Sequence, residues 1–523
     1  MTWLSWSPEA FARAKAQGKP VLAALGPLPP ETLKAAEGEI ALRFVPVLAD
    51  PQTRPDAAAR IGADRAVVLG ADGARRGELS LSAPDLGAAL ARLALDASGG
   101  SAGSGKTSPE PLIPIWTGAV REKAQEGVAP DAARVAEVFA ALPALSDPSD
   151  DVLEALLYAA SERSDAAARA ALERGLSAML DSSWDPSRRA FSLRAGPPLS
   201  VHARRARLLW DAHAFTGSAR WRDAALAATN HLLHVLREPG VGAFRASPGV
   251  AIYPADGNAL AALALLRAAA FGVAEAADAA SRTLGFLQSR LYDPLLGLVH
   301  AQGGEGEAVH GLLGDAAWTA LAFTEAFLAG GVKQHREFAD GLLRFLFQEL
   351  WERDGGGFLD RVPRAGDPAI LLETRVDPAL NAVALEVCWR LYHLKGTTNY
   401  KRWHDWGLRG AWPAGGSDPA RLAGLARAGD ISARGRADFE LVGRHGESKS
   451  EALLSALRRH YAPRAIVSFV DPDDQDYILA HKMEADSYPR LFGCGADLRR
   501  LADAGEPEGV GAVVAAVREA EAP

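Results

Sequence analysis

The chain has 523 residues, which is too long for a single hydrophobic core and predicts roughly two or three domains. Its net charge of −8 and the lack of a dense Lys/Arg run argue against a nucleic-acid partner. No segment offers about 20 uninterrupted apolar residues, so we expect no membrane span.

Cysteine usage and the chain start both bear on location. The only cysteines are Cys388 and Cys494, which lie far apart in the sequence. The first residues contain no basic stretch followed by an apolar one, so no signal peptide is expected. These features predict a protein of the reducing cytoplasm, and they exclude a disulfide framework or a zinc site built from cysteines.

Residues 1–97 mix helix and strand and predict a small α/β domain. The expected elements, in chain order, are a helix at Pro8–Gly18, strands at Pro20–Leu25, Phe44–Ala49 and Ala66–Gly70, and a closing helix at Ala83–Ala97. Residues 98–112 are rich in Ser, Gly and Pro, as a linker is. Their Gly105-Lys106-Thr107 follows no strand and opens no helix, so we do not interpret it as a nucleotide-binding loop.

Residues 113–415 are helical and internally repetitive. Apolar periodicity and helix breakers predict twelve helices, near 114–126, 131–145, 151–163, 165–181, 201–215, 219–237, 257–271, 273–291, 312–329, 333–351, 378–395 and 398–411. Short glycine turns alternate with longer loops, which places all the long loops at one end. Six hairpins predict a closed (α/α)6 toroid, the six-hairpin glycosidase-like fold, with an open solenoid as the alternative. Residues 416–523 predict a small α/β appendage.

Several motifs resemble one known family. Lys19-Pro20-Val21-Leu22 and the Arg54-Pro55-Asp56 triplet are similar to those of the spermatogenesis-associated, thioredoxin-domain-containing proteins. Further along, Leu313–Ala317 and Pro378…Asn381 resemble motifs of the same family, as does the segment around Phe439–Phe469. The resemblance covers nearly the whole chain. It implies a thioredoxin-like domain followed by a six-hairpin-glycosidase-type barrel.

One departure from the family changes the expected chemistry. The family carries a Cys-x-x-Cys element after the first strand of its thioredoxin-like domain, and those cysteines would fall at Pro30 and Leu33. Thiol–disulfide exchange requires a thiolate, which neither residue supplies. The chain is therefore expected to be a divergent, shorter member without redox activity.

The inner helices of such a toroid begin after the long loops, so their first turns converge at one mouth. We predict a site there, with Asp256, Asp315 and Asp377 as catalytic candidates, because paired carboxylates serve as acid and base on a glycosidic bond. The predicted ligand-binding residues are His202, Tyr253, Asn258, Glu373, Arg375, Asn381 and the aromatic Trp318, with Trp389 as a further stacking face. No metal-ligand spacing is present, and we expect neither a metal nor another cofactor.

Each candidate also has a plain structural interpretation. Asp256 and Asp377 stand where helix N-caps would. Asn258 and Asn381 are poor helix formers placed in first turns, where they serve equally for interhelical hydrogen bonds. Glu373 and Arg375 form a plausible ion pair, and Asp315 is the carboxylate least explained by capping, because the matching family position is also Asp.

Three functions remain open from the sequence. The first is a carbohydrate-active enzyme, hydrolase- or epimerase-like by resemblance. The second is a sugar- or metabolite-binding protein without catalysis. The third is a scaffold whose thioredoxin-like domain docks a protein partner. The accessibility and mutual distances of the three aspartates would separate them.

Overall fold

A computed structural model describes residues 2–26, 30–34, 36–82, 85–99, 130–191, 199–304, 307–444, 446–495 and 499–520. The chain divides into two compact units. The first unit comprises 1–121, 293–312 and 359–375, and the second comprises 122–292, 313–358 and 376–523. The helix expected at 114–126 and most of the expected linker lie outside the described residues. No described helix is long and apolar enough to cross a membrane.

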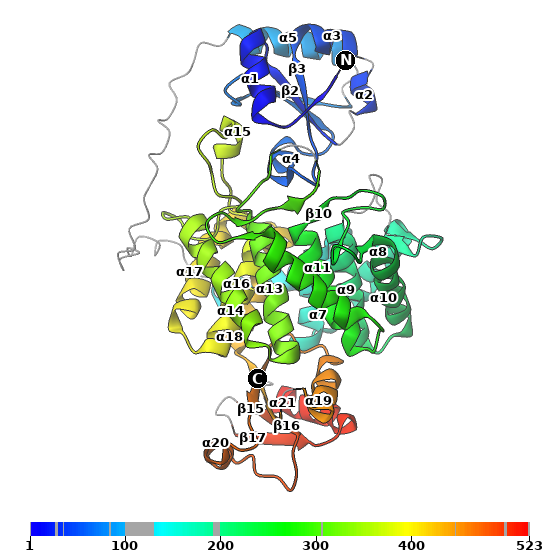
Figure 1. Cartoon of the computed structure of the whole chain (residues 1–523), viewed down its shortest axis with the longest axis vertical. Helices are drawn as coiled ribbons and strands as arrows, with labels where there is room; N and C mark the ends of the chain where they lie inside the picture. Colours follow the sequence, from blue (N-terminus) through cyan, green and yellow to red (C-terminus); the bar gives the residue numbers. More distant parts are fainter. Residues whose placement is uncertain are drawn as a thin grey trace. The chain divides into compact units, whose positions relative to one another are not determined.

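The first unit contains a mixed five-stranded sheet (Figure 1). Its strands are β1 (Leu4–Ser5), β2 (Val21–Leu25), β3 (Val45–Ala49), β4 (Arg65–Leu69) and β5 (Arg75–Ser80). Its helices are α1 (Pro8–Gln17), α2 (Glu31–Lys34), α3 (Glu37–Arg43), α4 (Pro55–Ile61) and α5 (Leu86–Gly99). The strand order is β1-β3-β2-β4-β5, with β1 and β2 parallel to β3 and β4 antiparallel to β2 and β5. This arrangement is compatible with the expected thioredoxin-like domain.

Two segments from much later in the chain complete the first unit. One of them, 293–312, contains β12 (Gly297–Leu298), β13 (Ala301–Gln302) and the buried His300, whose N–H donates to the carbonyl of Val309. The other, 359–375, contains α15 (Ala369–Leu372), whose Ile370 and Leu371 are buried in the same apolar core as β2 and β3. Backbone hydrogen bonds from Ala369 and Ile370 to the turn before β5 fix this segment. The N-terminal core is thus closed by residues about 300 positions downstream.

The Arg-Pro-Asp triplet anchors the second of these segments. Arg54 donates two hydrogen bonds of 3.0 Å to the carboxylate of Asp56, and Arg361 lies 3.8 Å from the same carboxylate while pairing with Asp367 at 2.8 Å. Burial alone would raise the pKa of Asp56, but the adjacent guanidinium groups lower it. The nearby Arg60 donates to the carbonyl of Glu373. The triplet therefore serves a buried ion-pair network.

The second unit contains a closed ring of six inner helices. Several of them, such as α11, α13 and α16, are labelled in Figure 1. They are α7 (Asp150–Glu162), α9 (Leu199–Thr216), α11 (Ala255–Ala270), α13 (Leu313–Gly330), α16 (Pro378–Lys395) and α18 (Pro419–Arg434). Each inner helix packs on the next, and α18 packs on α7 to close the ring. The outer helices are α6 (Ala132–Ala141), α8 (Ala166–Ser183), α10 (Ala219–His231), α12 (Ala276–Phe286), α14 (Lys333–Phe345) and α17 (Thr398–Gly415).

This packing confirms the predicted (α/α)6 toroid. The sixth inner position is held by α18, which lies within the stretch expected to belong to the C-terminal appendage. The ring helices therefore extend to Arg434 rather than to about 411. Only Gly416–Asp418 connect α17 to α18, so the long loop that signals every other inner helix is missing at this point.

In several of the longer loops, the outer helix ends in a π-helical turn and a short hairpin follows. Three outer helices end in such turns, at Leu232–Leu236, Leu287–Leu291 and Leu346–Leu350. Hairpin strands follow the outer helices: β6 (Trp184–Asp185) with β7 (Ala190–Phe191), β8 (Arg237–Glu238) with β9 (Ala243–Phe244), and β11 (Tyr292–Asp293) with β12. Gly242, Gly297 and Gly357 adopt φ values of 79°, 76° and 88° at equivalent places, a conformation that favours glycine.

The C-terminal region is a four-stranded α/β domain. Its elements are β14 (Ala437–Val442), α19 (Ser448–Arg458), β15 (Ala465–Val470), α20 (Gln475–Ala480), β16 (Arg490–Cys494), β17 (Arg500–Ala504) and α21 (Val510–Ala520). The strand order is β15-β14-β16-β17, with β14 parallel to β15 and antiparallel to β16. This is the same order and direction as β3-β2-β4-β5 of the first unit. The chain therefore carries the same four-stranded topology near both of its ends.

Candidate functional site

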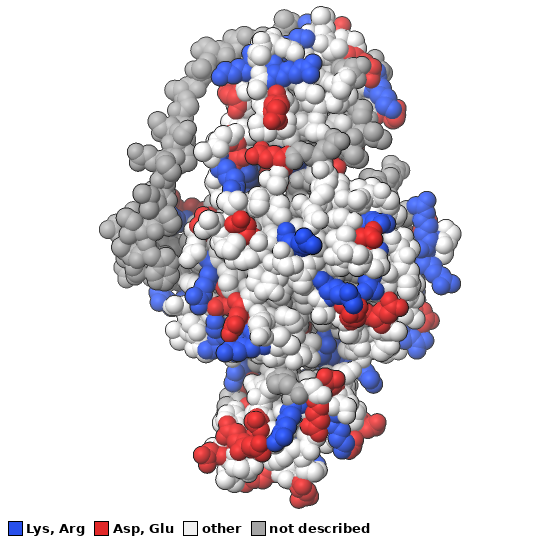
Figure 2. Space-filling view, in the orientation of Figure 1, with Lys and Arg blue, Asp and Glu red and all other residues white. Residues whose placement is uncertain are grey.

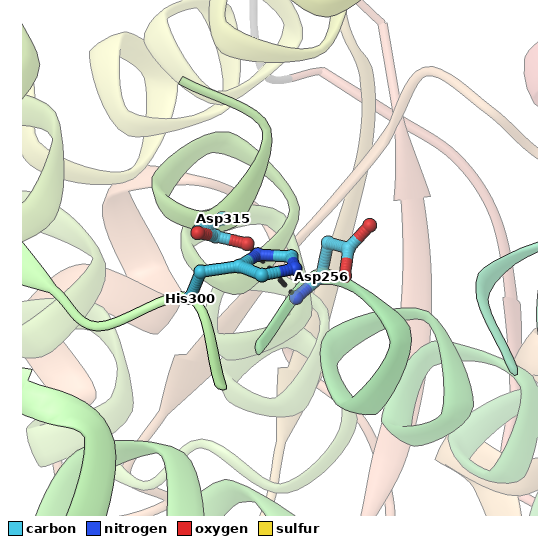
Figure 3. Close-up of side chains that lie close together, drawn as sticks. All are labelled: Asp256, His300 and Asp315. Carbon is cyan, nitrogen blue, oxygen red and sulfur yellow. Dashed lines mark hydrogen bonds between the residues drawn. The ribbon is translucent and has the colours of Figure 1, made fainter. Parts of the chain in front are cut away.

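Two predicted catalytic residues lie side by side at the first turns of neighbouring inner helices. Asp256 is the second residue of α11, and Asp315 is the third residue of α13. The backbone N–H of Asp256 donates to the carboxylate of Asp315 at 3.3 Å, and a carboxylate oxygen of each lies within 4.8 Å of the other (Figure 3). His300, also labelled in Figure 3, belongs to the first unit.

The two carboxylates differ in exposure. Asp315 is 1% exposed, whereas Asp256 is partly exposed and also accepts a hydrogen bond of 2.7 Å from the N–H of Gly257. Both stand at helix N-termini, where the helix dipole stabilises negative charge. A pair of carboxylates this close contains the two parts needed for acid–base or nucleophilic chemistry on a polar substrate.

The third aspartate serves its helix. Asp377 is the N-cap of α16, and its carboxylate accepts the N–H of Leu380 at 3.0 Å. Among the described residues, no hydrogen bond joins Asp377 to Asp256 or Asp315. The structure thus brings two of the three aspartates together and gives the third a capping role.

The two asparagines hold the hairpins that precede their helices. Each is the fourth residue of an inner helix and is fully buried. Asn258 accepts the N–H of Phe244 at 2.7 Å and donates to the carbonyls of Phe244 and Pro254 at 3.0 and 2.8 Å. Asn381 makes the equivalent bonds to Phe358, at 2.7 and 2.9 Å, and donates to the carbonyl of Asp377. These amides are occupied by the backbone.

His202 takes the same fourth position in α9. Its Nε2 lies 3.0 Å from the carbonyl oxygen of Ala228, and its ring contacts Phe191 and His231. Burial lowers the pKa of His202 to about 4, so the ring is neutral at pH 7. His202 is therefore a packing residue in the wall of the helical toroid, behind the mouth.

The aromatic candidates are buried as well. Tyr253 lies in β10 (Tyr253–Pro254) and packs edge-on against Phe286. The expected exposure of Trp318 and Trp389 is wrong, because they are only 7% and 1% exposed and pack within inner helices. The guanidinium of Arg204 lies 5.3 Å from the ring centroid of Trp318, a cation–π distance.

The last two candidates belong to the first unit. Glu373 and Arg375 are both exposed. The carbonyl of Glu373 accepts from Arg60, and the N–H of Arg375 donates to the carboxylate of Asp360. Among the described residues, no ion pair joins the Glu373 and Arg375 side chains.

Sequence reasoning missed a network of buried charges inside the ring. Glu154 pairs with Arg204 at 2.8 Å and with Arg427 at 3.4 Å. Glu386 pairs with Arg427 and Arg390, both at 2.9 Å. Burial alone would raise the pKa of Glu154, but the charge and hydrogen bond of Arg204, with the charge of Arg427, lower it to about 2.

A signal for this network was present in the sequence. Glu386 and Arg390 stand four residues apart within the apolar middle of helix α16, on a face that must point into the ring. On the surface drawn in Figure 2, positive and negative side chains are intermixed over the molecule. Inside the ring, by contrast, arginines and carboxylates alternate along the ion-pair network just described.

No protein-family model and no curated protein matches the chain. Among solved structures, the chain is similar to a glycoside hydrolase family 76 mannosidase, Bt3792 from Bacteroides thetaiotaomicron VPI-5482, at 14% identity and a TM-score of 0.38, over 46% of this chain and 70% of that one. A sugar epimerase from a ruminal bacterium gives 16% identity and a TM-score of 0.38, over 45% and 67%.

A third structure is an inactive variant of the alpha-1,6-mannanase GH76A of Salegentibacter sp. HEL1_6 in complex with alpha-1,6-mannotriose. It gives 13% identity and a TM-score of 0.45, over 57% of this chain and 98% of that one. These similarities are low, so the (α/α)6 assignment rests on the helix packing of the ring itself.

Proposed function

We propose that the chain is a carbohydrate-active protein that binds a sugar at the mouth formed by the first turns of the inner helices. The observation that carries the proposal is the close pair of carboxylates, Asp256 and Asp315, on adjacent helices. In this proposal the pair acts on a glycosidic bond, and the protein performs no thiol–disulfide exchange.

The separation of the pair favours a retaining hydrolysis. Retaining glycosidases hold their two carboxyl groups about 5–5.5 Å apart, whereas inverting enzymes leave room for a water between groups about 6.5–9.5 Å apart. One oxygen of each carboxylate lies within 4.8 Å of the other, which is compatible with the shorter spacing.

We assign the two carboxylates different roles. Asp315 attacks the anomeric carbon, because the N–H of Asp256 and the N-terminus of α13 stabilise its ionised form. The more exposed Asp256 protonates the leaving oxygen and then removes a proton from the water that releases the sugar.

The proposal is tested by comparing Asp315→Asn and Asp256→Asn with Asp377→Asn as the matched control. All three positions lie at inner-helix starts, and Asn caps a helix nearly as well as Asp. We expect every variant to melt within a few degrees of the parent. Hydrolysis of a panel of aryl glycosides should fall at least about 100-fold for Asp315→Asn and Asp256→Asn and stay unchanged for Asp377→Asn.

Sugar-induced thermal shifts, measured on the same proteins, distinguish the alternatives. A parent protein that binds sugars without hydrolysing the panel would be a sugar-binding protein without catalysis. A parent that does neither would contradict the proposal and favour the scaffold, with the N-terminal domain as the docking surface. Hydrolysis that survives Asp315→Asn would place the catalytic site elsewhere.

A further inference from the structure

The opposite end of the ring contains a cavity. It has a volume of about 120 Å³ and lies where the C-terminal halves of the inner helices meet the end of α19 and the start of β15. A buried water needs about 10–15 Å³ by a comparable measure, so the space is large enough for a small ion with several waters. Five arginines and four carboxylates line the cavity.

The carboxylates are already used by four of the five arginines. Glu154, Glu325 and Glu386 pair with Arg390 and Arg427. Asp211 is shared between Arg267 at 2.7 Å and Arg207 at 3.7 Å. Arg207 is thus held only loosely by a carboxylate that has a closer partner.

Arg458, at the end of α19, is the arginine left over. Its Nη2 donates to the carbonyl of Leu266 at 2.8 Å, and among the described residues no carboxylate lies within 4.0 Å of its guanidinium. Burial lowers the pKa of Arg458 to about 10; Glu325 partly opposes this, and Arg267 adds to it. The group still carries its charge at pH 7. A buried charge without a counter-ion is destabilising unless an anion enters.

We propose that this cavity binds a small oxyanion, of the size of inorganic phosphate, between Arg458, Arg207 and Arg267. Arg458 and Arg207 present the planar sets of N–H donors that match oxyanion oxygens. Arg267 already donates to the carbonyls of Arg458 and His460 and pairs with Asp211, so it contributes its charge beside the anion. The site lies at the other end of the inner helices from Asp256 and Asp315, so it is independent of the proposed sugar chemistry.

The test compares two adjacent arginines at the same helix end. Arg458 and Arg459 both donate to carbonyls of the last turn of α11, Leu266 and Ala270, but only Arg458 lines the cavity. Calorimetric titration with inorganic phosphate, against chloride at equal ionic strength, is performed on the parent, Arg458→Gln and Arg459→Gln. We expect saturable binding for the parent and Arg459→Gln, and at least tenfold weaker binding for Arg458→Gln.

Arg207→Gln keeps the test decisive if Arg458→Gln does not fold. Within the described parts of the chain, the ion pair of Arg207 is the long one to Asp211, so its loss should leave the ring folded while weakening phosphate binding at least fivefold. No saturable binding by the parent would overturn the proposal. Equal affinities for the Arg458 and Arg459 variants, or full affinity in Arg207→Gln, would overturn it as well.

Discussion

The two ends of the inner ring differ in their charged residues: the first turns carry aspartates, whereas the cavity at the other end combines five arginines with four carboxylates. Five of the six inner helices have an aspartate at the N-cap or in the first turn, while arginines gather toward the C-terminal halves. The helix dipole favours this distribution at both ends. A charged residue at a helix end is therefore weak evidence for a site. The informative residue is one that capping and ion pairing among the described residues do not account for, such as Arg458 at the cavity.

The largest effect expected is on the network between the two ends. Glu154→Gln removes one of the two carboxylate partners of both Arg204 and Arg427, which then keep Asp151 and Glu386, respectively. The free energy of unfolding should fall by about 3 kcal/mol, the low end for breaking a buried ion pair. Asp151→Asn is the matched control, since Asp151 pairs with Arg204 alone and its side chain is 26% exposed. Equal losses in urea denaturation would show that the buried network adds nothing beyond a surface pair.

The dependence of the free energy of unfolding on acidic pH gives a second measurement on Glu154. The folded pKa of Glu154, about 2, lies below its unfolded value of 4.5. Its contribution is therefore complete above pH 4.5 and is lost as the pH falls from 4.5 toward 2. The stability difference between the parent and Glu154→Gln should shrink over that interval and remain constant from pH 5 to 7.

A smaller loss of stability is expected on replacing Asn258 and Asn381, the asparagines that hold the hairpins at the mouth. Asn381→Ala leaves the N–H and C=O of Phe358 without partners, which should cost about 1–3 kcal/mol. Asn258→Ala should behave alike at Phe244. Asn230→Ala, on the outer helix α10, is the control and should stay within about 0.5 kcal/mol of the parent. If Asn381→Ala and Asn258→Ala kept full stability but lost sugar binding, the two amides would belong to the binding site.

The paired helices of the ring could be predicted from the sequence, but the polar and charged contacts inside the ring could not. Glycine turns alternating with long loops predict paired helices, and that pattern fails only before α18, where three residues suffice for the connection. The fourth residues of α9, α11 and α16 are polar for packing reasons, which a single sequence does not distinguish from binding. Partners such as Arg204 and Glu154 lie 50 residues apart, so no local pattern reveals their contact.

The first unit shows the same limit over a longer distance. Ile370 and Leu371 enter a core built by residues before 70, and nothing in the spacing of either segment predicts this contact. Leu33, which stands at one of the expected cysteine positions, has a packing role that the sequence did not predict. It is fully buried in the apolar core on the other face of the sheet. Strands β16 and β17 were not predicted; in β16 the glycine Gly493 interrupts the apolar pattern.

The smallest effect expected separates a cap from a site at the mouth itself. Asp377→Ala removes the acceptor of the Leu380 N–H and should lower the free energy of unfolding by about 1 kcal/mol, whereas Asp377→Asn should change it by only a few tenths, roughly. Neither substitution should alter sugar binding, measured by thermal shift, because the carboxylate of Asp377 already serves the backbone of α16. Asp315 should show the reverse pattern, with binding lost in the Asn variant and stability nearly kept. If Asp377→Asn also abolished binding, its carboxylate would have to reach the ligand while capping. The mouth would then hold three acting carboxylates instead of the pair on α11 and α13.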